Sequence, residues 1–138
     1  MSTIIARKTE LHICKKLREA IPGITVIPFH GGGETDDAFE TEPPFAVVAV
    51  SSAEKMMGTE STYLVDGSVQ WVTHLSETTP QNHAQGAKAV KDALNELIAA
   101  SESDFAFHGI DISTEERAED QSSRARADVI RFKAGVGG

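Results

Sequence analysis

The sequence predicts an α+β fold in which two amphipathic helices pack on a mostly antiparallel sheet. Two separated segments have the apolar spacing of helices, and short runs rich in β-branched residues lie between and after them. No repeat of fixed period and no low-complexity linker divides the chain. Its 138 residues suffice for one hydrophobic core, so we expect a single α+β domain over 1–138.

The first helix is expected to begin at Ser2 or Thr3, either of which can cap it, and to end near Ile21 before Pro22-Gly23. Apolar residues recur there at spacings of three, four and seven, which predicts one buried face made of Ile4, Leu11, Cys14, Leu17 and Ile21. The next segment, Ile24–Phe29, has the composition of a strand.

The middle of the chain predicts further strands. Phe45–Val50 is a nearly continuous apolar run, which indicates a central strand covered on both faces. Tyr63–Val65 and Val69–Leu75 flank Asp66-Gly67, a pair suited to a tight turn, so we expect a β-hairpin there. Glu54–Gly58 fits either a turn or one turn of helix.

The last third predicts a helix and two strands. Thr79 can cap a helix that has Pro80 at its first position and continues to about Ala100. Two apolar runs follow, Phe105–Ile110 and Val129–Val136, and they are expected to be strands. Between them lies a charged segment at about 111–128, which predicts a solvated stretch that meets something outside the domain.

The charge balance argues against a general nucleic-acid or membrane-binding surface. The chain has 13 Lys and Arg against 21 Asp and Glu, a formal net charge of −8 and a pI near 5.0. An acidic loop is expected at about 34–44, where carboxylates occur without a base: Glu34, Asp36, Asp37, Glu40 and Glu42. No apolar run suits a signal peptide or a membrane span, so we expect a soluble protein made in the cytoplasm.

Catalytic and metal-binding motifs are missing from the sequence. His30-Gly31-Gly32-Gly33 follows a strand, but no G-x-S-x-G nucleophile motif accompanies it, so a flexible joint is the better interpretation. The five histidines show no metal-ligand spacing. Cys14 is the only cysteine and is expected to be a buried, inert thiol. Trp71 is expected to be a core anchor or an interface residue, and the core is the better interpretation. We therefore expect no enzyme, no cofactor and no metal.

The order of these segments resembles that of phage tail terminators and related neck or tail-completion proteins of long-tailed bacteriophages. The stretches that carry the resemblance span most of the chain: Ile21-Pro22-Gly23, Ile24–Phe29, Pro43–Val48, the region of Asp66-Gly67, Gln81–Ala100 and Val129–Val136. The resemblance implies a ring, usually a hexamer, at the head-proximal end of the tail tube, where it ends tube growth and joins the tail to the head. It implies a virion location, with the tail tube protein and a neck or head-completion protein as partners.

Two groups of charged residues are candidates for this role. A ring of copies that each carry −8 needs local charge complementarity, which predicts an interface formed by Arg7, Lys8, Lys15, Arg18, Glu115, Glu116, Glu119, Arg124 and Arg126. The acidic loop is expected either to contact a neighbour or to line a channel through which genomic DNA passes without specific binding.

Other function classes remain open from the sequence alone. A neck or head-completion protein of the same virion would have a similar size and composition. A small cytoplasmic enzyme or ligand-binding domain would use a pocket bounded by His30, His74 or His108, and a monomeric adaptor would act through the acidic loop.

Overall fold

The computed structural model describes residues 3–30, 44–55, 62–75, 78–97, 106–120 and 125–137, with only the backbone described at 3, 106, 108 and 113–120. Its elements, in chain order, are α1 (Thr3–Ala20), β1 (Thr25–Pro28), β2 (Phe45–Lys55), β3 (Thr62–His74), α2 (Pro80–Asn95), β4 (Ala106–Asp120) and β5 (Ala125–Gly137). The predicted α+β class with two helices is confirmed.

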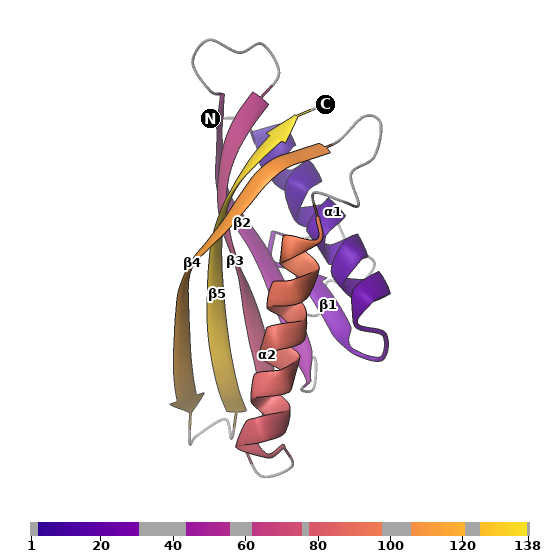
Figure 1. Ribbon diagram of the computed structural model, residues 1–138, viewed down its shortest axis with the longest axis vertical. Helices are drawn as coiled ribbons and strands as arrows, with labels where there is room; N and C mark the ends of the chain where they lie inside the picture. Colours follow the sequence, from indigo (N-terminus) through magenta and orange to yellow (C-terminus); the bar gives the residue numbers. More distant parts are fainter. Residues whose placement is uncertain are drawn as a thin grey trace.

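The strands form one sheet in the order β1-β2-β3-β5-β4 (Figure 1). β1 pairs with β2 in parallel, and every other neighbouring pair is antiparallel. Among the described strands, β1 and β4 therefore form the two edges of the sheet.

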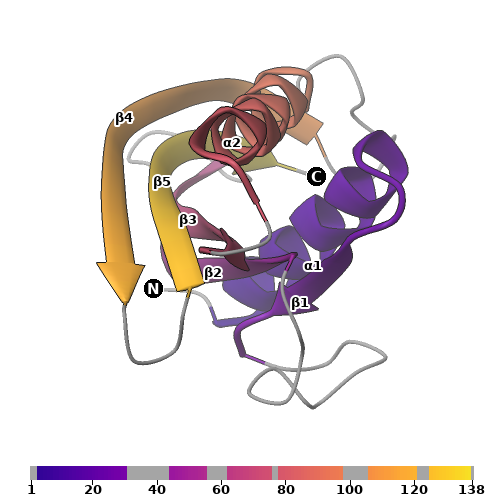
Figure 2. The same cartoon turned by 90° about the horizontal axis from the view of Figure 1, so that it is seen from below.

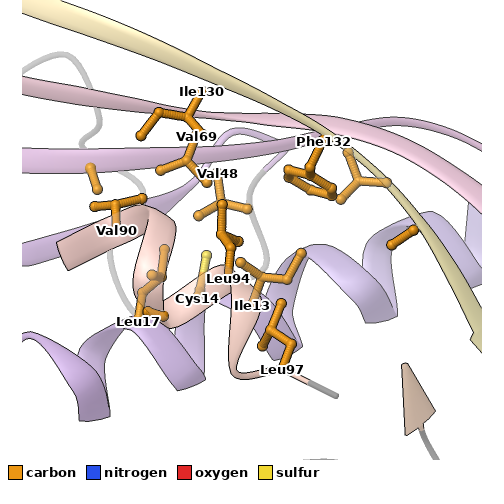
Figure 3. Close-up of a cluster of buried hydrophobic side chains, with 14 of the residues drawn as sticks. Ile13, Cys14, Leu17, Val48, Val69, Val90, Leu94, Leu97, Ile130 and Phe132 are labelled. Carbon is orange, nitrogen blue, oxygen red and sulfur yellow. The ribbon is translucent and has the colours of Figure 1, made fainter. Parts of the chain in front are cut away.

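Both helices lie on the same face of the sheet, which curves around them (Figure 2). Side chains of α1, α2 and the inner sheet face meet in one core, where Ile13, Leu94 and Phe132 are almost completely buried (Figure 3). Burying such side chains away from water is the main favourable contribution to folding.

The buried face of α1 differs from the predicted one. Cys14 and Leu17 are buried as expected, but Ile4 is 80% exposed and Leu11 is 37% exposed. The core face instead includes Thr9 and Glu10, both fully buried. An apolar-only count misplaced the face because two polar residues occupy buried positions of the helix.

α2 begins as predicted. Thr79 caps it in an extended conformation, and its Oγ1 accepts a hydrogen bond from the N–H of Asn82 at 3.1 Å. The helix ends at Asn95, short of the predicted Ala100, and Glu96 forms the C-cap.

The central position of β2 is confirmed, but its coverage is not as expected. Burial alternates along Phe45–Val50, with Ala46, Val48 and Val50 fully buried and the residues between them partly exposed. Helices cover only one face of the sheet, so a continuous apolar run does not signify burial on both faces here. Glu54 and Lys55 belong to this strand, which excludes the one-turn helix proposed for them.

The predicted hairpin at Asp66-Gly67 is wrong. β3 continues through both residues, and Gly67 pairs with Val50 on one side and Phe132 on the other. A Cβ at Gly67 would lie 2.6 Å from Cζ of Phe132 and 2.7 Å from the carbonyl oxygen of Ala49. The glycine is therefore required for close packing within the sheet and not for a turn.

The charged segment 111–128 is also different from the expected solvated stretch. β4 continues to Asp120, and β5 already begins at Ala125. The two strands pair antiparallel over this region, with Glu115 opposite Ile130 and Glu119 opposite Arg126. Both strands are longer than the apolar runs Phe105–Ile110 and Val129–Val136 had indicated. Their polar composition gave no signal for the additional strand residues.

Candidate functional site

The basic residues of α1 on the side of the sheet edge are bonded within the chain. Phe29 donates its N–H to the carbonyl of Val48, at the point where β1 ends. Beyond that point no described strand pairs with β2 on the side away from β3, and the guanidinium of Arg7 donates to the carbonyl of Val50 at 2.7 Å. Arg18 donates to the carbonyl of Val26 in β1, also at 2.7 Å.

Glu10 completes this closure of the sheet edge. Its carboxylate is fully buried and accepts hydrogen bonds from the N–H of Val50 at 2.9 Å and the N–H of His30 at 3.1 Å. The Nδ1 of His30 also lies 2.8 Å from Glu10 Oε1. Sequence reasoning did not single out Glu10. Its position four residues before Cys14 was a signal, because residues at this spacing lie on the same face of a helix.

The outward side of α1 carries a different set of residues. Ile4, Lys8, Leu11 and Lys15 follow one another at helical spacings of four and three, and all are exposed. We call these four residues the α1 stripe. It combines two apolar side chains with two cations, and Lys8 and Lys15 belong to the predicted interface.

The other predicted interface residues lie mostly at the far edge of the sheet. Glu115, Glu116 and Glu119 belong to β4, the edge strand, where their backbone is described. Arg126 is buried in β5, 7% exposed, and its Nη1 lies 3.4 Å from the carbonyl oxygen of Thr78. Outside the described residues are Arg124 and the five acids of the predicted loop, Glu34, Asp36, Asp37, Glu40 and Glu42.

A buried polar network joins α2 to the sheet. The His83 ring lies with Nδ1 2.6 Å from Thr73 Oγ1 and with Nε2 2.9 Å from Asp128 Oδ1. Trp71 donates its indole N–H to the backbone carbonyl of His83 at 3.0 Å. The sequence had placed Trp71 in the core, and this is confirmed.

The set of Thr73, His83 and Asp128 has the residue types of a catalytic triad but not its setting. His83 and Asp128 are 0% exposed and Thr73 is 2% exposed. A nucleophile must reach its substrate, and a hydroxyl sealed beneath a helix does not. The network therefore fixes α2 on the sheet.

Two of the histidines proposed for a ligand pocket, His74 and His108, lie far apart in the sheet. His74 is opposite Ala125 at one end of β5, whereas His108 lies in β4 between residues that pair with the other end, at Val136 and Gly135. Eleven residues of β5 separate these ends, about 35 Å of extended strand. Within the described residues, no three His, Cys, Asp or Glu side chains form a group suited to a metal ion.

Cys14 is buried as predicted, and burial raises the pKa of its thiol from 9.0 to about 12. A thiol that stays protonated at neutral pH is a poor nucleophile. In the described part of the chain, no helix is long and apolar enough to span a membrane.

No protein-family model matches the sequence, and no curated protein sequence matches it significantly. Solved structures do match its fold. One is a chain in the structure described as "Virion of native gene transfer agent (GTA) particle", with a TM-score of 0.57 and 16% sequence identity. The match covers 99% of this chain and 96% of that chain. The two chains therefore share a fold over nearly their whole lengths.

Proposed function

We propose that the chain is a structural protein of a phage-like virion and forms a ring at the head-proximal end of the tail tube. The ring ends tube growth and provides the surface for head-tail joining. The observation that carries this proposal is the fold shared with a chain of a gene transfer agent virion over 99% of this chain. The order of its segments, which resembles that of tail terminators, supports the same role.

The chemistry of the described residues supports a role without catalysis. Four buried polar side chains, Glu10, Thr73, His83 and Asp128, hold helices on the sheet. Such contacts stabilise the fold, and these buried groups are not placed to act as an activated nucleophile on a substrate. The only cysteine is equally inert because it is buried.

A closed ring also needs two different surfaces on each copy. The basic sequence of α1 and the acidic sequence of β4 support this proposal. The acidic residues from Glu34 to Glu42 are assigned to the lumen, where their charge would repel the phosphates of passing DNA.

The test is to delete the coding sequence of this protein from the genome that produces the particle and to examine the particles by electron microscopy. A tail terminator predicts abnormally long tails that lack heads, with recovery when the intact protein is supplied. Headless tails of normal length would instead assign the protein to the neck or to head completion. Normal, infectious particles would contradict the proposal.

A further inference from the structure

The two edges of the sheet, β1 and β4, differ in length and in the side chains that bond their backbone. The β1 edge is short and ends at Pro28. Side chains of α1 bond the backbone there: Arg18 bonds Val26 of β1, and Arg7 and Glu10 bond Val50 of β2 beyond the end of β1. Natural proteins close sheet edges by such devices to prevent unwanted strand pairing. At the other edge β4 extends over 15 residues, and among the described strands only β5 pairs with it.

The two surfaces have opposite charge. The α1 sequence contains five Lys and Arg against two Asp and Glu, one of which is the buried Glu10. The β4 sequence contains five Asp and Glu against one Arg. Opposite charges on two surfaces attract copies of the chain and fix how they meet.

The acidic part of β4 lies away from α1. Figure 2 shows the C-terminal half of β4 at one margin and α1 with β1 at the other. The start of β4 instead reaches α1, where the ring centroids of Phe107 and His12 are 5.7 Å apart. A contact between different surfaces of identical copies is head-to-tail, and repeated head-to-tail contacts make a ring when the rotation closes.

We infer that the α1 stripe of one copy covers the β4 edge of the next. Lys8 and Lys15 approach the acidic strand, and Ile4 and Leu11 pack against it. The same helix already bonds strand backbone in its own chain, through Arg18 at β1 and Arg7 at β2. This inference rests on the proposed ring and names its interface.

The spacing of the charges is compatible with this contact. Lys8 and Lys15 are seven residues apart on a helix, an axial separation of about 10 Å. Glu116 and Asp120 are four residues apart on a strand, a separation of about 13 Å. Flexible lysine side chains bridge a difference of this size.

The inference is tested by exchanging charges between the two surfaces. One variant carries Lys8→Glu and Lys15→Glu, and the other carries Glu116→Lys and Asp120→Lys. Glu116 and Asp120 are paired with uncharged residues of β5, Val129 and Ala125, so reversing their charges breaks no ion pair between these paired positions. Both variants are full-length and are checked for folding by circular dichroism.

Each variant alone is expected to self-associate at least about tenfold more weakly than the wild type, because like charges then face each other. An equimolar mixture is expected to recover the wild-type oligomer with the two variants alternating, measured by native mass spectrometry. The matched control is Lys55→Glu with Lys88→Glu, two exposed positions outside β4 and β5 with the same change of charge, and it should associate like the wild type. Unchanged association of the stripe variant, or failure of the mixture to recover, would overturn the inference.

A second measurement detects the contact even where association is weak. A photoreactive phenylalanine analogue replaces Leu11, and the protein is mixed with isotopically heavy copies before illumination. Crosslinks from position 11 to residues 106–120 of another copy are expected, and their absence or their location elsewhere would overturn the interface. A discrete ring with crosslinks elsewhere would overturn this interface but not the proposed function. The expected crosslinks in a particle of only two copies would support the interface but contradict the proposed ring.

Discussion

His83 is the residue that most directly fixes α2 to the sheet. Its ring contacts Thr73 of β3 and Asp128 of β5, and its carbonyl accepts the indole N–H of Trp71. These groups are buried, so each depends on its partner in place of water. The sequence contains five histidines and does not show that His83 is the buried one that bonds Thr73 and Asp128. These partners are 10 and 45 residues away in sequence.

Replacing Asp128 by Ala is expected to lower the free energy of unfolding by about 1–3 kcal/mol, because it leaves the buried His83 ring without its hydrogen-bond partner. Urea denaturation followed by circular dichroism measures the change. The exposed pair Lys88–Asp92 provides the control, since Asp92→Ala is expected to cost less than about 1 kcal/mol. Equal effects of the two substitutions would show that the buried network is not stabilising.

Cys14 predicts a loss of stability at alkaline pH. Its pKa rises from 9.0 in the unfolded chain to about 12 in the fold, so between these values the folded chain holds a proton that the unfolded chain has released. Stability is therefore expected to fall by about 1.4 kcal/mol per pH unit above pH 9. Denaturation of the wild type and of Cys14→Ala at pH 8 and pH 10.5 measures this. Parallel pH profiles of the two proteins would contradict it.

At the scale of elements, periodicity predicted both helices, the cap at Thr79 and the strand at Phe45–Val50. It failed where a residue serves tertiary packing. Glu10 occupies a core position because the backbone of β2 needs a partner, and this shifts the buried face of α1. Gly67 indicates a turn by local rules, yet it lies mid-strand because Phe132 packs against it. Neither reason is local, so neither is present in a short sequence window.

Gly67→Ala distinguishes the packing role from a turn. Added to the space filled by Phe132 and the Ala49 carbonyl, the methyl group is expected to lower stability by about 1–3 kcal/mol through overpacking. Gly109 in β4 is the matched control, because a Cβ there meets nothing within 4 Å among the described residues. Thermal unfolding of both variants is the measurement, and a Tm for Gly67→Ala at or above that of Gly109→Ala would contradict the packing explanation.

At the scale of the whole molecule, the fold shared with a virion chain and the two oppositely charged edges lead to one account. The sequence supplied the fold class, the resemblance to tail terminators and both groups of charged residues. It did not supply the position of the acidic end of β4 at the margin away from α1, because that depends on the strand order, with β4 outside β5. In the proposed ring, this topology is what allows an acidic strand and a basic helix to meet head-to-tail between copies.

The measurement that tests this account most directly is the mass of the purified protein by size-exclusion chromatography with light scattering, from micromolar concentrations upward and at two salt concentrations. The account predicts a discrete closed oligomer, near six copies of 14.8 kDa or about 89 kDa, that forms more readily at low salt. A protein that stays monomeric at every concentration and at both salt levels would contradict a ring formed through these surfaces.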